Sequence, residues 1–117
     1  MKRGKVWTVA GGGEYTSKPR PVVIVQDDRF DASDSITVCG FTSSVAELPY
    51  FRVLVQPNDT NGLQVASRVL VDKITTVRRT RLRTPLGHLD PNDIQRLNRA
   101  LLVYLGLADP DKAPQLP

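Results

Sequence analysis

Short apolar runs interrupted by polar positions dominate the chain up to residue 77. Alternation over a few residues is typical of half-buried strands, and β-branched side chains favour the same state. Clusters of glycine, proline, asparagine and aspartate separate the runs and favour turns. The pattern predicts strands at residues 5–9, 21–26, 36–41, 51–56 and 67–77, the last with a bend near Asp72.

A helical pattern appears only near the C-terminus. Asp90 is a good N-cap, and Pro91 suits the first helical position. Apolar side chains then recur at helical spacing, and Gly106 ends the helix. These are Ile94, Leu97, Leu101 and Leu105. No strand is assigned after residue 77, and His88 is placed in a turn. Many short strands and one terminal helix predict a small, strongly bent sheet or barrel with the helix packed on it.

The length of 117 residues predicts one domain, at residues 1–108, followed by a flexible tail at 109–117. No apolar run approaches the roughly 20 residues of a membrane span. The basic start lacks an apolar segment behind it, so no secretory signal is expected. Cys39 is the only cysteine in the sequence, which excludes an internal disulfide and favours the cytoplasm.

Charge and composition narrow the chemistry. The net charge of +4 favours an anionic partner, such as nucleic acid or an acidic protein segment. With one cysteine and one histidine, a zinc site within one chain is not expected, and no cofactor is predicted. A Ser–His or Cys–His nucleophile would have to use His88. Any catalysis is therefore expected to work without a metal and without a histidine base.

Arg20 stands at the start of the apolar run 21–26, between Pro19 and Pro21. The proline that follows it favours extended backbone at Arg20. A cation held at the mouth of a buried strand either pairs with a carboxylate as a structural anchor or acts on a ligand. The residues alone leave both alternatives open.

Several segments, in this order and spacing, resemble the MazF/PemK/Kid family of toxin–antitoxin endoribonucleases. They are Arg3-Gly4-x-Val6-Trp7, 20–25, 41–43, 62–63, 69–77, 81–82, Gly87-x-Leu89 and 105–107. The resemblance implies a mainly β fold, a small SH3-like barrel with a C-terminal α-helix, assembled as a homodimer. It also implies metal-independent cleavage of single-stranded RNA at short sequence motifs. In that chemistry the ribose 2′-OH attacks the adjacent phosphate, leaving a 2′,3′-cyclic phosphate and a 5′-OH.

The resemblance places the catalytic arginine at Arg20 and the catalytic threonine at Thr42, with Ser43 as a residue that could share the role. A guanidinium suits a dianionic, five-coordinate phosphorus because its planar fork reaches two oxygens at once. The alternative for Thr42 is a strand-end hydroxyl that caps a backbone group. Asp72 could act as base or orient Arg20, or it could equally hold a turn.

RNA contacts are expected from a further set of residues, namely Glu14, Tyr15, Lys18, Gln26, Lys73 and Arg78. Tyr15 is a candidate for base stacking, and Glu14 is a second candidate base. The basic stretch from Lys73 to Arg83 either attracts RNA phosphates or forms a solvated face.

The resemblance also implies a partner, an acidic, largely disordered antitoxin of the MazE type that covers the RNA site. A gyrase poison of the CcdB type is one alternative, although the chain ends in Pro114-Gln115-Leu116-Pro117 rather than the Trp-Gly-Ile associated with that activity. A non-catalytic, SH3-like nucleic-acid-binding module is the other.

Overall fold

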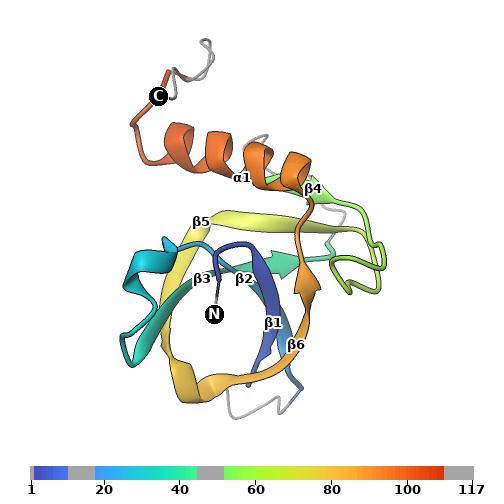
Figure 1. Cartoon of the computed structure of the whole chain (residues 1–117). Coiled ribbons are helices and arrows are strands. Elements are labelled where there is room, and N and C mark those ends of the chain that lie inside the picture. Colours follow the sequence, from blue (N-terminus) through green and yellow to red (C-terminus); the bar gives the residue numbers. More distant parts are fainter. Residues whose placement is uncertain (1, 11–17, 45–51, 110–117) are drawn as a thin grey trace.

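The computed structural model describes residues 2–10, 18–44 and 52–109, in which a curled antiparallel sheet supports one α-helix (Figure 1). The strands are β1 (Lys5–Val9), β2 (Arg20–Ile24), β3 (Ser35–Thr42), β4 (Val53–Val55), β5 (Ser67–Arg78) and β6 (Leu82–His88). The other elements are two 3-10 turns, η1 (Asp28–Phe30) and η2 (Arg79–Arg81), and the helix α1 (Pro91–Tyr104). The strand order β4-β5-β3-β2-β1-β6 leaves β4 and β6 as edges, so hydrogen bonds within these residues do not close the barrel. The mainly β, barrel-like fold with a C-terminal helix is confirmed.

The bend predicted near Asp72 is a bulge in β5. Cys39 of β3 pairs with Ile74, whereas Phe41 pairs with Val69. Two steps along β3 therefore correspond to five along β5, and the extra residues bend the strand. The strand turns a corner of the molecule at this place (Figure 1).

The last strand, β6, was missed by the sequence analysis, and the placement of His88 in a turn was wrong. The strand contains Pro85 and Gly87, which both resemble turn signals. It tolerates them because it lies at the edge of the sheet, where a proline costs no ladder hydrogen bond. Its register against β1 shifts on both sides of Trp7, which is consistent with this irregular sequence.

Apolar side chains cover both faces of β2. Val23 belongs to a core that β4, β5 and α1 share, and Val22 and Ile24 belong to a second core on the other face. In α1, Leu97 is fully buried, as its position in the apolar stripe predicts. Leu105 lies beyond the last turn of the helix and is 54% exposed, so the stripe is one residue shorter than expected.

The loop between β4 and β5 is fixed against β6. The buried Asn61 organises this loop, and the backbone N–H of His88 donates to the carbonyl of Thr60 at 2.9 Å. Gly62 has φ +70°, and a Cβ there would lie 2.2 Å from the carbonyl oxygen of Leu86. Only glycine fits such a conformation and such a close approach.

The helices of the described residues include none with the length and apolar character needed to cross a membrane.

Candidate active site

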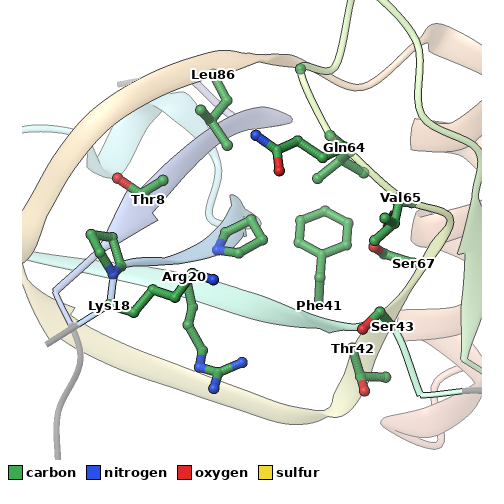
Figure 2. A pocket seen from close by; sticks show the side chains of 14 residues that line it. Thr8, Lys18, Arg20, Phe41, Thr42, Ser43, Gln64, Val65, Ser67 and Leu86 are labelled. Carbon is green, nitrogen blue, oxygen red and sulfur yellow. Dashed lines mark hydrogen bonds between the residues drawn. The ribbon is translucent and has the colours of Figure 1, made fainter. Parts of the chain in front are cut away.

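A pocket of about 460 Å³ lies where β2 begins and β3 ends (Figure 2). Antiparallel pairing of β2 with β3, with Val22 opposite Gly40, brings these two strand ends together. Four residues expected at the site line this pocket, namely Lys18, Arg20, Thr42 and Ser43. The structure thus brings together residues from two separate segments of the sequence, one at the start of β2 and the other at the end of β3.

Arg20 is exposed, and its side chain forms no ion pair with a carboxylate among the described residues. Its backbone is held in place because it pairs with Val9 of β1 and leads into the buried part of β2. The structure therefore gives no support to the alternative in which Arg20 anchors a carboxylate. Within the described residues, no carboxylate competes with an anion in the pocket for this guanidinium.

Thr42 is half-buried, and its Oγ1 accepts a hydrogen bond from the backbone N–H of Ser44 at 3.1 Å. The backbone-capping role considered for this hydroxyl is therefore present. This hydrogen bond uses only one acceptor site of the hydroxyl, which has one donor as well as two acceptor sites. The cap orients the hydroxyl and leaves its proton available to an oxygen in the pocket.

Asp72 does not line this pocket and is bound elsewhere. Arg52 holds it with two parallel hydrogen bonds, 2.9 Å from Nε to Oδ1 and 2.6 Å from a terminal nitrogen to Oδ2. The side chains are 13% and 18% exposed. The hydrogen bonds from Arg52 lower the pKa of Asp72, so its carboxylate is ionised and both oxygens are engaged. Asp72 lies within β5 rather than at a strand end, and the guanidinium that engages its two oxygens is that of Arg52, not Arg20.

The Arg52–Asp72 pair predicts a pH-dependent contribution to stability. Because the pKa of Asp72 is lower in the folded state than its ordinary value of 3.8, its contribution is present above that pH and is lost as the pH falls through the folded pKa. We expect Asp72→Asn to have a lower free energy of unfolding than the wild type at pH 7, and the difference to close below about pH 3.8. Urea unfolding from pH 7 to pH 2.5 measures this. The matched control is Asp59→Asn, at an exposed carboxylate, for which no such difference is expected. A gap that stays constant over this pH range would contradict the prediction.

The remaining residues expected to contact RNA are dispersed. Lys73 and Arg78 are exposed on β5 outside the pocket. Gln26 is used structurally, since its Oε1 accepts the backbone N–H of Thr37 at 2.9 Å and its Nε2 donates to the carbonyl of Phe30 at 3.1 Å. Glu14 and Tyr15 lie outside the described residues, and their roles stay predictions.

Much of the basic stretch after Lys73 holds the chain together. Arg79 pairs with Asp31 at 3.2 Å and donates to the carbonyl of Ser33 at 2.8 Å. Arg81 donates to the carbonyl of Ala10 at 2.7 Å. These guanidinium groups hold the turns of the sheet. Fewer arginines of this stretch are therefore available to bind RNA than the sequence suggests.

The pocket lining contains no carboxylate or imidazole among the described residues. His88 is at the far end of β6, where its Nδ1 lies 3.2 Å from the carbonyl of Leu89. Cys39 is fully buried, and this burial raises the pKa of its thiol to about 11, which leaves it neutral at pH 7. Among the described residues, no three His, Cys, Asp or Glu side chains gather closely enough to hold a metal ion.

Sequence reasoning missed part of the lining. Gln64 and Val65, from the loop between β4 and β5, face Phe41 across the pocket (Figure 2). No periodicity marks such loop positions. The only sequence signal was the Gly62-Leu63 segment just before them.

Comparison with known proteins gives a consistent result. Residues 2–105 match the family described as PemK-like, MazF-like toxin of type II toxin–antitoxin system. The chain is 48% identical to a probable endoribonuclease MazF of Mycolicibacterium smegmatis, covering 92% of this chain and 99% of the relative. It is 32% identical to endoribonuclease MazF9 of Mycobacterium tuberculosis, covering 92% and 98%. Among solved structures, an endoribonuclease in complex with its cognate antitoxin from a mycobacterial species is 26% identical. Its TM-score is 0.77, and the match covers 94% of this chain and 99% of that one.

Proposed function

The chain belongs to the PemK-like, MazF-like toxins of type II toxin–antitoxin systems, and on that premise we propose that the pocket at Arg20 and Thr42 is its RNA-cleaving site. The protein is an endoribonuclease of this family. The observation that carries the proposal is that one pocket is lined by an oriented hydroxyl and by a guanidinium that no described carboxylate pairs with. A phosphodiester is the anion that such a pair suits, because both groups donate to phosphate oxygens.

The proposed reaction needs no external nucleophile. The ribose 2′-oxygen gives up its proton to water and attacks the adjacent phosphorus, the bond from phosphorus to the 5′-oxygen of the next nucleotide breaks, and that 5′-oxygen takes up a proton from water. The products are a 2′,3′-cyclic phosphate and a 5′-OH. Arg20 stabilises the charge that builds on the non-bridging oxygens, and Thr42 donates a hydrogen bond to one of them. Since arginine stays protonated, Arg20 is not the base. The proposal therefore rests on charge stabilisation in the pocket.

The proposed partners follow from the family and the charge. The net charge of +4 favours both RNA and an acidic antitoxin segment of the MazE type. The mycobacterial structure described as a complex with a cognate antitoxin supports such a partner for this chain. We further place the protein in the cytoplasm as a homodimer, as the family resemblance implies. The relatives named endoribonuclease weigh against the gyrase-poison and non-catalytic alternatives.

The test of this function is cleavage of a defined single-stranded RNA by the purified protein in excess EDTA. We expect discrete products with a 5′-OH and a 2′,3′-cyclic phosphate, and no cleavage of the same sequence annealed into a duplex. End-labelling before and after phosphatase or polynucleotide kinase treatment identifies the termini. Absence of cleavage, or products that carry a 3′-OH, would contradict the proposed reaction.

A further inference from the structure

The pocket has an apolar half that the proposed chemistry does not use. Phe41 and Leu86 are half-buried there, and Val65 is 55% exposed. In Figure 2 the ring of Phe41 stands between the guanidinium and hydroxyls of the cleavage site and the side chain of Gln64. Phe41 also packs against the core, which restrains its ring. It is the only aromatic residue of the described part that lines this pocket.

Gln64 supplies a polar group to this apolar half. Its side chain is exposed, and its amide makes no hydrogen bond with another residue of the described chain. The amide group points into the pocket (Figure 2). A glutamine amide offers an acceptor and two donors side by side, which is the pattern that matches a nucleobase edge.

The loop that carries Gln64 is held rigidly. The Oδ1 of Asn61 accepts the backbone N–H groups of Asn58 at 3.1 Å and Leu63 at 2.9 Å. Its Nδ2 donates to the carbonyl of Gln56 at 2.9 Å. With Gly62 pressed against Leu86, the backbone before Gln64 has little freedom. A preorganised loop loses less entropy when it binds a ligand.

We propose that Phe41 and Gln64 form a subsite for one base of the RNA, next to the cleaved phosphodiester. The base stacks on the ring of Phe41 beside Val65, and the amide of Gln64 reads its polar edge. Adenine is the expected base, because a glutamine amide pairs with its amino group and the neighbouring ring nitrogen. This inference rests on the proposed cleavage at Arg20 and adds the residues that select the sequence.

The experiment compares the wild type with Gln64→Leu on an RNA pool of randomised sequence, with the 5′ ends of the products sequenced. Gln64→Leu removes hydrogen bonding and keeps a similar length. We expect the adenine preference at one position near the cut to fall about 10-fold or more, with other positions unchanged. Gln95→Leu, on the exposed face of α1, is the matched control and keeps the wild-type profile. A Gln64→Leu profile identical to the wild type would overturn the subsite.

A binding measurement separates this inference from the proposed function. RNA oligonucleotides with 2′-O-methyl groups cannot undergo the cleavage step, so their affinity reports recognition alone. We expect fluorescence anisotropy to show about 10-fold weaker binding for Phe41→Leu, through lost stacking, and a reduced adenine preference for Gln64→Leu. If the wild type cleaves RNA and both variants bind it as the wild type does, the subsite is overturned and the assignment of the cleavage site stands. If the wild type binds RNA with base selectivity but does not cleave it, only the proposed reaction is overturned.

Discussion

Replacing Arg20 with alanine is expected to slow RNA cleavage by about 10²–10³-fold, the effect of removing one preorganised group from a developing phosphorus dianion. Thermal unfolding is expected to stay unchanged, because Arg20 is exposed and pairs with no described carboxylate. Arg20→Lys retains the charge but loses the planar fork, so we expect its activity to fall between the two. Single-turnover cleavage of a short RNA with one cut site measures the rate of the chemical step separately from binding.

The matched control for Arg20→Ala is Arg99→Ala. Arg99 is exposed on α1, and its replacement changes the net charge by the same amount. General attraction of RNA to the protein therefore weakens equally in both variants. If the two variants cleave at rates within about 3-fold of each other, Arg20 acts only through general charge, and the assignment of the site is wrong.

The family resemblance placed Arg20 and Thr42 at one site, and the structure gives the physical reason why they lie together. Consecutive strands that pair antiparallel place the start of the first beside the end of the second, so residues flanking the two apolar runs must meet. The fold class followed from the same runs, which β2 and β3 bear out. The helix likewise began at Pro91, as its N-cap and proline signals predicted.

Other features of the site depend on contacts between residues distant in the sequence, which no local pattern encodes. Asp72 was expected either to act in catalysis or to hold a turn, yet Arg52 engages both of its oxygens across 20 positions of the chain. Gln26 was expected to contact RNA, but its side chain closes the turn between β2 and β3. β6 was missed because Pro85 and Gly87 signal turns unless the strand is known to be an edge.

The proposed base selection also depends on contacts between residues that are distant in the sequence. Gln64 carries no local signal of function, and its position follows from a buried asparagine three residues earlier and a glycine that contacts another strand. The loop is thus shaped by residues that never touch RNA. In this scheme Gln64 can vary independently of the catalytic pair, because it belongs to a separate element, whereas Phe41 shares β3 with Thr42.

Asn61→Ala is expected to lower the free energy of unfolding by about 2–4 kcal/mol, because it leaves buried backbone groups of the loop without partners. Asn61 is fully buried, and its side chain satisfies two N–H groups and one carbonyl. This is a large part of the stability of a small domain, which is of the order of 5–15 kcal/mol. Urea unfolding followed by the fluorescence of Trp7 measures the loss.

The control for Asn61→Ala is Asn92→Ala, at an exposed asparagine of α1, where a change within about 0.5 kcal/mol is expected. Hydrogen exchange then locates the effect. We expect protection to fall first at the amide of Leu63, whose partner is the Oδ1 of Asn61, while the central amides of β2 and β3 keep theirs. If the loop opens in this way, base selectivity at the Gln64 position should weaken before the rate of cleavage at the preferred site does. An Asn61→Ala protein as stable as the Asn92→Ala protein would contradict the role of Asn61 in holding the loop.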